Sequence, residues 1–297
     1  MYKPTGMIPA VPTPFDVNEQ FDKKEYRKLI ESLIEAGMHC LLTDGSTGEY
    51  SLMSLEERKE VIATACQVAD GRVPIMAGTS CARTEDTIAL TKFAEEAGAD
   101  CALIITPYYM KTSEQGIIDY YTAIAESVSI GIVIYHYPGA TNVELSPQLI
   151  HRLSQIPGIV GVKNTTDQEH TCKVIALVQD NPNFAVLTGY EHLILPTLAV
   201  GGDGATGIVH NLIPHEIVKL YNLFKENKIA EAIALNKKLA PLYDYVEQEP
   251  SPGPVKAGLE VLGYESVYVR KPLVPTTDEL KAKIEGILQE LGKLVAK

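Results

Sequence analysis

The feature that most limits the possible folds is an alternation of short apolar runs with longer segments of helical periodicity, repeated eight times in about 225 residues. Apolar runs of four to five residues are typical of strands buried on both faces, as in a parallel sheet. Eight such units with short connections fit a (β/α)8 barrel better than an open sheet. No Gly-x-Gly-x-x-Gly turn follows the first run, which argues against a dinucleotide-binding sheet. The predicted strands are residues 7–11, 40–43, 73–77, 102–105, 131–134, 159–162, 184–187 and a short one within 201–207.

Further helical patterns follow the last predicted strand, at residues 215–225, 228–246, 253–263 and 276–295. A barrel needs only the first of these helices, so the others are expected to form an appendage. We therefore predict an α/β fold with two parts, a (β/α)8 TIM-barrel catalytic domain at 1–225 and a C-terminal helical domain at 226–297.

Composition excludes several classes of function. The formal net charge is −12 and no basic run occurs, so nucleic acid is not an expected partner. No stretch approaches the roughly 20 apolar residues of a membrane span, and residues 1–6 lack the apolar segment of a signal peptide. We expect a cytoplasmic protein with reduced cysteines, because the five are odd in number and scattered. They are Cys40, Cys66, Cys81, Cys101 and Cys172.

The predicted strand at 159–162 runs directly into Lys163 and a polar cluster. An amine at the rim of an apolar interior loses solvation, which lowers its pKa and makes it a nucleophile toward carbonyl groups. A lysine at a strand end can instead extend its ammonium group into water. The pattern alone therefore fits either a reactive buried amine or an exposed lysine.

The other strand ends supply mainly hydroxyl groups. In a barrel these ends share one mouth, and no group of His, Cys, Asp and Glu with metal-ligand spacing occurs among them. A Schiff-base mechanism fits this inventory, with a phenol as acid or base. The loop 45–49 offers N–H and O–H donors that suit a carboxylate, or it is only a glycine-containing turn. The residues at the strand ends are Thr43 to Glu49, Thr79, Thr106 to Tyr109, Tyr135, Lys163 and Gly189 to Glu191.

Several motifs in this order resemble the dihydrodipicolinate synthase and N-acetylneuraminate lyase family of Schiff-base lyases. The resemblance covers essentially the whole chain and implies a (β/α)8 barrel with a C-terminal helical domain. It is carried by Gly-Ser-Thr-Gly-Glu at 45–49, Pro-Tyr-Tyr at 107–109, Tyr135 three residues before Pro138, and Gly-Val-Lys at 161–163. Gly-Tyr-Glu at 189–191 and Gly-Gly-Asp-Gly at 201–204 add weaker support.

The resemblance implies roles for individual residues. Lys163 would form an imine with pyruvate or another 2-oxo acid, and Tyr135 would shuttle protons. Ser46 and Thr47 would hold the 2-oxo acid carboxylate, and Ser46 would link Tyr135 to Tyr109 in a hydroxyl relay. In the family a neighbouring subunit supplies the latter tyrosine, which implies a homodimer or homotetramer. No cofactor beyond the imine and no metal is expected. The remaining expected substrate-binding residues are Gly48, Gly189, Glu191 and Thr206.

Some positions depart from named members of the family. Dihydrodipicolinate synthases have an arginine, for the carboxylate of aspartate semialdehyde, where this chain has Ala140. Sialic acid lyases have Gly-Tyr-Asp-Glu where residues 189–192 read Gly-Tyr-Glu-His, and a serine in place of Ile208. His136 stands where the family usually has asparagine, as a substrate ligand, as an extra acid or base, or as a core residue on the opposite strand face. Glu191 would bind a substrate hydroxyl or cap the helix that follows the seventh strand.

The resulting prediction is a Schiff-base lyase acting on a 2-oxo acid, with pyruvate as donor or product. Its leading form is an aldolase for 2-keto-3-deoxy sugar acids, because no arginine awaits a second carboxylate. The alternatives are 4-hydroxy-tetrahydrodipicolinate (dihydrodipicolinate) synthase, N-acetylneuraminate lyase, and a dehydratase or deaminase on the same lysine. Rivals from other classes are a non-catalytic barrel that senses 2-oxo acids and a metal-dependent aldolase.

Overall fold

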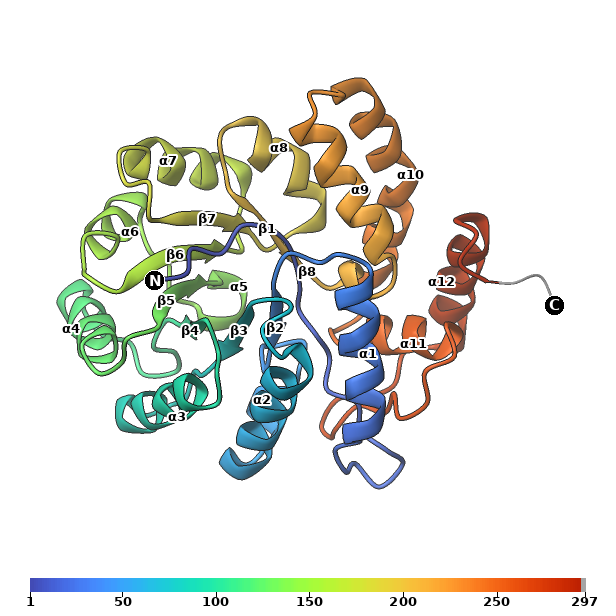
Figure 1. Ribbon diagram of the computed structural model, residues 1–297, viewed down its shortest axis with the longest axis horizontal. Coiled ribbons are helices and arrows are strands. Elements are labelled where there is room, and N and C mark those ends of the chain that lie inside the picture. The colour runs from blue at the N-terminus through green and yellow to red at the C-terminus, as the bar shows by residue number, and fades with distance from the viewer. Residues whose placement is uncertain (295–297) are drawn as a thin grey trace.

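The chain forms a barrel of eight parallel strands, in the order β1-β8-β7-β6-β5-β4-β3-β2. The computed structural model describes residues 1–294. The barrel closes between β1 and β2, where Ala10 pairs with Leu42 and Val11 N–H donates to the Leu42 carbonyl at 2.9 Å (Figure 1). The predicted TIM barrel is therefore confirmed. The strands are β1 Gly6–Pro9, β2 Leu41–Thr43, β3 Ile75–Gly78, β4 Cys101–Ile105, β5 Gly131–His136, β6 Ile159–Asn164, β7 Ala185–Thr188 and β8 Gly204–Gly207.

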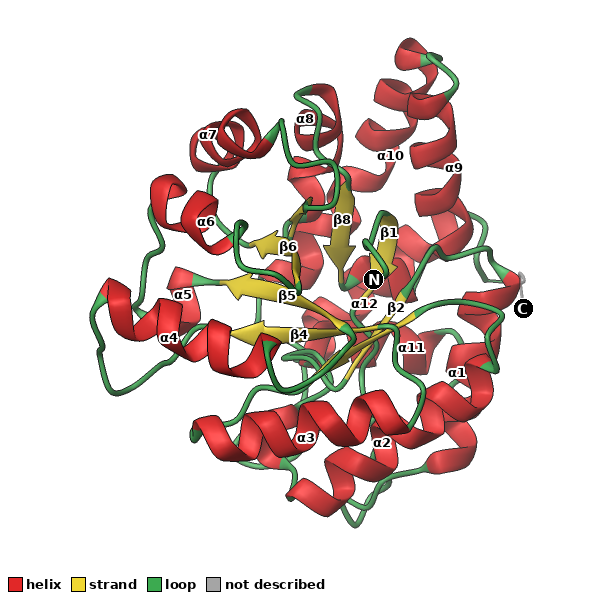
Figure 2. Ribbon diagram, turned by 60° about the vertical axis from the view of Figure 1, so that its left-hand side comes forward, coloured by secondary structure: helices red, strands yellow, loops and turns green. Residues whose placement is uncertain are grey.

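Helices surround the strands, which lie at the centre of the molecule in Figure 2. The chain also forms three 3-10 helices, η1 Tyr50–Leu52, η2 Glu191–Leu193 and η3 Val209–Asn211. The α-helices are α1 Lys23–Glu35, α2 Leu55–Ala69, α3 Thr84–Glu96, α4 Glu114–Ala125, α5 Pro138–Thr141, α6 Pro147–Leu153, α7 Gln168–Val178, α8 Ile194–Ala199, α9 Pro214–Lys225, α10 Ile229–Glu247, α11 Gly253–Val261 and α12 Asp278–Glu290.

Local capping signals fix where many of the helices begin. Ser54 accepts a hydrogen bond from Glu57 N–H, and the Glu57 side chain accepts from Ser54 N–H, which is a complete capping box. Asp22, Ser113 and Asp167 cap α1, α4 and α7 with their side chains. These caps satisfy amide groups that a helix leaves without intrahelical partners.

Three clusters of buried apolar side chains form the core. The two larger clusters lie mainly between the strands and the surrounding helices. A third cluster fills the barrel interior, with residues such as Ile8, Met76 and Leu187 at 0% exposure. The interior is thus a packed core rather than a channel.

A C-terminal helical part follows the barrel and lies at one side of it, where α10 packs against α9 and α12, and α11 against α12 (Figure 1). The predicted helices are present with shifted ends. The last one begins at Asp278 and ends at Glu290 rather than 295, which lies outside the described residues. The domain division between 225 and 226 stays a prediction, although it falls in the connection between α9 and α10.

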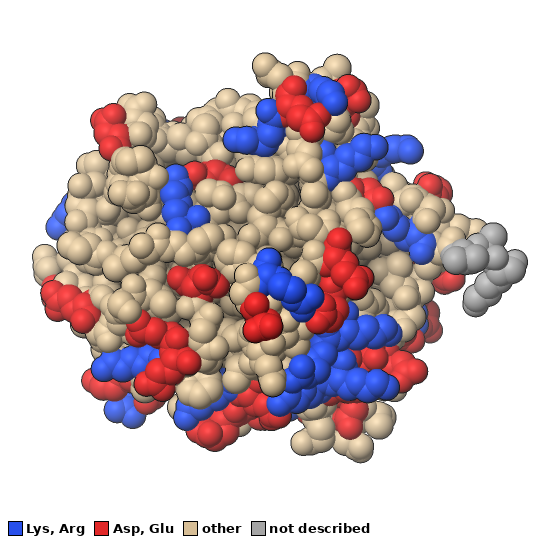
Figure 3. Space-filling model, viewed as in Figure 1, with Lys and Arg blue, Asp and Glu red and all other residues tan. Residues whose placement is uncertain are grey.

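Charges of both signs are interspersed over the face shown in Figure 3, without one large patch of a single sign. No described helix combines the length and the apolar character that a membrane crossing requires.

Candidate active site

A pocket of about 540 Å³ opens at the carboxyl ends of the strands. This end of a (β/α)8 barrel carries the reactive groups of enzymes with this fold. Seven of the residues expected at the site line the pocket together: Ser46, Thr47, Tyr135, Lys163, Gly189, Glu191 and Thr206. The other lining residues are Ala10, Tyr137, Thr165, Tyr190, Ile208 and the run from Val246 to Ser251.

Lys163 and Tyr135 are neighbours across two paired strands. Lys163 lies within β6 rather than beyond it, and its Cα is in register with Tyr135 of β5 and Leu187 of β7. Parallel neighbours in register point to the same face, so both side chains reach the same mouth. The Lys163 Nζ lies 4.4 Å from the centre of the Tyr135 ring.

The protonation of these two groups is set by burial. Lys163 is 7% exposed, and burial lowers its pKa to about 8, while the negative charge of Glu191 acts in the opposite direction. No described residue accepts a hydrogen bond from its Nζ. Burial raises the pKa of the Tyr135 phenol to about 12, although the nearby side chains of Ser46 and Thr165 act in the opposite direction. The arrangement thus combines an amine that deprotonates readily with a phenol that keeps its proton.

Ser46 and Thr47 lie on a tight loop between β2 and η1. Gly48 N–H donates to the Gly45 carbonyl at 3.0 Å, and Glu49 N–H donates to the Ser46 carbonyl at 3.0 Å. The Gly48 carbonyl accepts from Thr13 Oγ1 at 2.8 Å. Gly48 itself does not line the pocket, so this expected substrate-binding residue shapes the loop through its backbone.

Glu191 is 3% exposed and lies deep in the pocket. Its Oε1 accepts from Ile208 N–H at 2.5 Å and Val209 N–H at 2.9 Å. It therefore caps the turn after β8, which neither sequence-based interpretation anticipated. Burial raises the pKa of this carboxyl, and the two backbone hydrogen bonds lower it.

Gly189 and Thr165 illustrate how closely the pocket wall is packed. A Cβ on Gly189 would lie 2.0 Å from Thr165 Oγ1, so only glycine fits beside that side chain. Thr165 follows Lys163 by two residues and faces the same pocket because alternate strand positions share a face. That alternation was the signal in the sequence that could have identified it.

Tyr109 is the one predicted catalytic residue that lies apart from the others. It is 92% exposed, its φ is +65°, and it does not line the pocket. Met110 beside it is 75% exposed. Within one chain, the structure does not bring Tyr109 to Lys163.

His136 lies on the other face of β5 and does not line the pocket. It is fully buried, its Nδ1 bonds Asn164 Oδ1 at 2.7 Å, and its Nε2 accepts from Leu145 N–H at 3.1 Å. His170 completes the ring, since it bonds both Asn164 Nδ2 and the Leu145 carbonyl. Burial lowers the pKa of His136 to about 4, so the imidazole is neutral near pH 7.

The end of α10 contributes a wall that sequence reasoning missed. Glu247, Gln248 and Glu249 line the pocket together with Tyr137 and Tyr190. These residues are far from the strand ends in sequence, and no local pattern marks them. Among the described lining residues Lys163 is the only lysine or arginine, and Ala140 lies outside the lining.

No group of three or more His, Cys, Asp or Glu side chains in the range 1–294 is arranged to hold a metal ion.

A family model described as the dihydrodipicolinate synthetase family matches residues 3–291. The chain belongs to this family. The 4-hydroxy-tetrahydrodipicolinate synthase of Methanothrix thermoacetophila is 38% identical over 290 residues, covering 97% of each chain. The prediction of an enzyme, a lyase of the dihydrodipicolinate synthase family, is therefore confirmed.

Solved structures of family members have the same fold. A dihydrodipicolinate synthase from Thermotoga maritima superposes with a TM-score of 0.95 at 31% identity, covering 99% of this chain and 100% of the other. A prophage protein of the family from E. coli K12, in complex with pyruvate, gives 0.94 at 34% identity, covering 98% and 99%.

Proposed function

We propose that this chain is a pyruvate-dependent Schiff-base aldolase in which Lys163 forms the imine. One observation carries the proposal. A buried lysine whose pKa is lowered to about 8 lies 4.4 Å from the ring of a protonated phenol, at the carboxyl end of a barrel. The family membership supports the same chemistry, because Lys163, Tyr135 and Ser46, to which the resemblance assigns the imine and the proton transfer, line one pocket.

In the proposed reaction the neutral Lys163 amine adds to the pyruvate ketone. The Tyr135 phenol delivers a proton to the departing oxygen, and water leaves as the imine forms. Loss of a proton from the pyruvate methyl group gives an enamine, whose carbon attacks the carbonyl of an aldehyde. Hydrolysis of the new imine releases a longer 2-oxo acid and restores the lysine. Cleavage is the same sequence in reverse.

Ser46 and Thr47 are proposed to bind the pyruvate carboxylate, because their hydroxyls line the pocket together with Lys163. Tyr109 is proposed to act in the pocket of a second copy of the chain, where Ser46 would link it to Tyr135. Its exposed position supports this role, since a side chain inserted into a neighbouring subunit is exposed in the isolated chain. The proposed enzyme is thus a homodimer or homotetramer.

The aldehyde is proposed to be uncharged and hydroxylated, as in 2-keto-3-deoxy sugar acids. Glu191, Glu247 and Glu249 line the same pocket as Lys163. Carboxylates accept hydrogen bonds from hydroxyl groups and repel a second carboxylate. Tyr137 and Tyr190 add phenols that can donate or accept.

A second candidate is 4-hydroxy-tetrahydrodipicolinate synthase, in which aspartate semialdehyde is the aldehyde. The observation in its favour is the name of the relatives, including one from Methanoculleus marisnigri at 39% identity over 290 residues, covering 96% of this chain and 98% of the relative. Against it stands Ala140, which cannot form the forked contact of an arginine with a carboxylate.

The test has two steps. Wild type and Lys163→Ala are treated with pyruvate and sodium borohydride, and intact mass is measured. One reduced adduct in wild type alone is expected, and its absence from wild type would overturn the proposal. Pyruvate consumption is then compared between glyceraldehyde and aspartate semialdehyde. Faster turnover with glyceraldehyde is expected, whereas faster turnover with aspartate semialdehyde would select the second candidate.

A further inference from the structure

The loop that carries Ser46 and Thr47 is held at both ends by a buried ion pair. Asp44 precedes the loop with φ +55°, and Glu49 ends it with φ +61°. Left-handed backbone at residues other than glycine is strained and persists only where neighbouring contacts hold it. Both side chains are acidic and buried, at 0% and 3% exposure.

The first ion pair lies within the barrel domain. Arg58 of α2 donates from Nε to Asp44 Oδ2 at 2.8 Å, and its other nitrogens donate to the carbonyls of Ser80 and Gly78. The guanidinium therefore links one end of the loop to β3 and the residues that follow it.

The second ion pair comes from the C-terminal helical part. Lys256 of α11 donates from Nζ to Glu49 Oε1 at 2.5 Å, with side chains 2% and 1% exposed. The same Nζ donates to the Tyr268 carbonyl at 2.6 Å, and Arg270 N–H donates to Glu49 Oε2 at 2.8 Å. Both oxygens of Glu49 are thus satisfied by residues more than 200 positions away in the chain.

This anchorage is directly connected to the loop. Glu49 N–H donates a hydrogen bond to the Ser46 carbonyl. Displacement of Glu49 therefore also displaces Ser46, whose side chain lines the pocket. Removing one partner of a buried pair leaves a charge without solvent or counter-ion, which favours movement of that charge toward water. The first consequence is a change in the positions of Ser46 and Thr47.

We infer that Lys256 is a positioning residue for the pyruvate carboxylate, through which the C-terminal helical part shapes the catalytic pocket. The inference rests on the proposed function, because it assumes that Ser46 and Thr47 bind that carboxylate. Lys256 does not line the pocket and takes no part in the chemistry. Its effect appears in the affinity for pyruvate and not in the capacity of Lys163 to form an imine.

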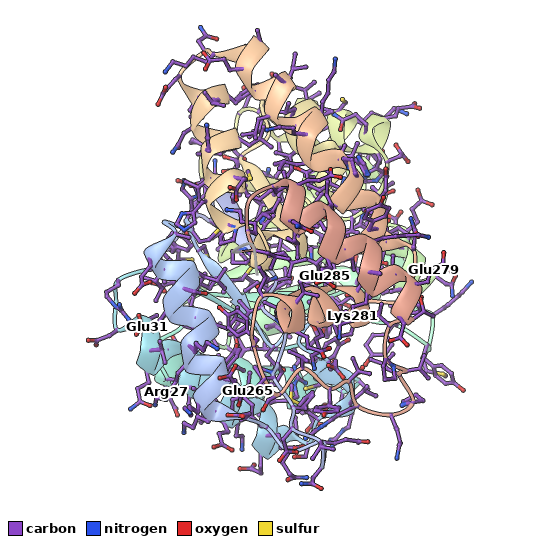
Figure 4. All side chains as sticks on the ribbon, turned by 90° about the vertical axis from the view of Figure 1, so that its right-hand side faces the viewer. Arg27, Glu31, Glu265, Glu279, Lys281 and Glu285 are labelled. Carbon is purple, nitrogen blue, oxygen red and sulfur yellow. The ribbon has the colours of Figure 1, made fainter. Side chains whose placement is uncertain are left out.

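The test measures the pyruvate concentration that gives half of the maximal borohydride-trapped adduct. Lys256→Met is expected to raise it about tenfold or more, the equivalent of about 1.4 kcal/mol, and to leave the maximal adduct at one per chain. The matched control is Lys281→Met. Lys281 lies on α12 (Figure 4) and pairs with Glu260 at 2.7 Å, with side chains 32% and 50% exposed. It is expected to behave as wild type.

A second variant covers the case in which Lys256→Met does not fold. In Glu49→Gln/Lys256→Met the buried charge is gone, while the amide oxygen can still accept from Arg270 N–H. This double variant is expected to fold and to lie between Lys256→Met and wild type in pyruvate affinity. Half-saturation equal to wild type in folded Lys256 variants, with only the melting temperature lowered, would overturn the inference and leave the proposed function intact. Failure of wild type to trap pyruvate would instead defeat the proposed function.

Discussion

Lys163 and Lys256 are both buried, at 7% and 2% exposure, and burial lowers the pKa of each amine, that of Lys163 to about 8. Their partners differ. The Lys256 Nζ lies 2.5 Å from the Glu49 carboxylate and 2.6 Å from the Tyr268 carbonyl, and both acceptors stabilise its charged ammonium form. Lys163 has no hydrogen-bond partner among the described residues, and its surroundings are a phenol ring and pocket space.

This difference separates a structural lysine from a reactive one. Loss of a proton from Lys256 would leave Glu49 as a buried carboxylate without its counter-ion, so the pair gains nothing by deprotonation. Loss of a proton from Lys163 removes a desolvated charge and breaks no hydrogen-bonded ion pair. Burial alone therefore does not make a lysine a nucleophile; burial without a hydrogen-bonded carboxylate does.

The largest expected contrast is in stability. Lys256→Met breaks a buried ion pair and is expected to cost about 3–5 kcal/mol of the free energy of unfolding. Lys163→Met replaces a poorly solvated amine with an apolar side chain of similar length and is expected to leave stability unchanged or higher. Urea unfolding followed by circular dichroism measures both. Equal losses of unfolding free energy in the two variants would contradict the distinction between a structural and a reactive lysine.

The second contrast is in pH dependence. Because only the neutral amine attacks pyruvate, adduct formation on Lys163 is expected to rise about tenfold per pH unit up to a midpoint near pH 8. Glu191→Gln removes the charge that raises the Lys163 pKa, so the midpoint is expected to move to lower pH. Lys281→Met, at the surface, is expected to keep it. The rate of borohydride-trapped adduct formation is measured at a series of pH values. An unchanged midpoint in Glu191→Gln would contradict the effect of the Glu191 charge on the Lys163 pKa.

The same two lysines show what a sequence can and cannot predict. Lys163 was identifiable because its neighbours form a local pattern, an apolar strand that runs into one amine. The eight-fold alternation that predicted the barrel is local in the same sense. No local pattern marks Lys256, because its partner Glu49 lies 207 positions away and no periodicity connects them.

The missed parts of the site have the same origin. Glu247 and its neighbours reach the pocket only because α10 packs beside the barrel, so their place depends on tertiary contacts. Glu191 was noticed in the sequence, but its hydrogen bonds to Ile208 and Val209 join two different strand ends. Residue types at strand ends are predictable from spacing, whereas the partners of each side chain across the fold are not.

The smallest expected effect concerns the lack of a second lysine or arginine beside Lys163 among the described residues that line the pocket. Ala140 is exposed and lies on α5, the helix that begins directly after the pocket residue Tyr137. Ala140→Arg would place a second cation near the mouth, and a forked contact with a carboxylate is expected to raise kcat/KM for aspartate semialdehyde about tenfold or less.

Steady-state kinetics with aspartate semialdehyde and glyceraldehyde distinguish a charge effect from a general one. Ala140→Gln is the matched control, because it adds a polar side chain without charge. If Ala140→Arg improves turnover of aspartate semialdehyde alone, the missing cation limits the use of that aldehyde. If neither variant changes the ratio of the two aldehydes, position 140 does not select the aldehyde, and the acidic wall from α10 becomes the part of the pocket to alter. Glu247→Gln would then be expected to shift the ratio of the two turnover rates toward aspartate semialdehyde, because it removes a carboxylate that repels the carboxylate of that substrate.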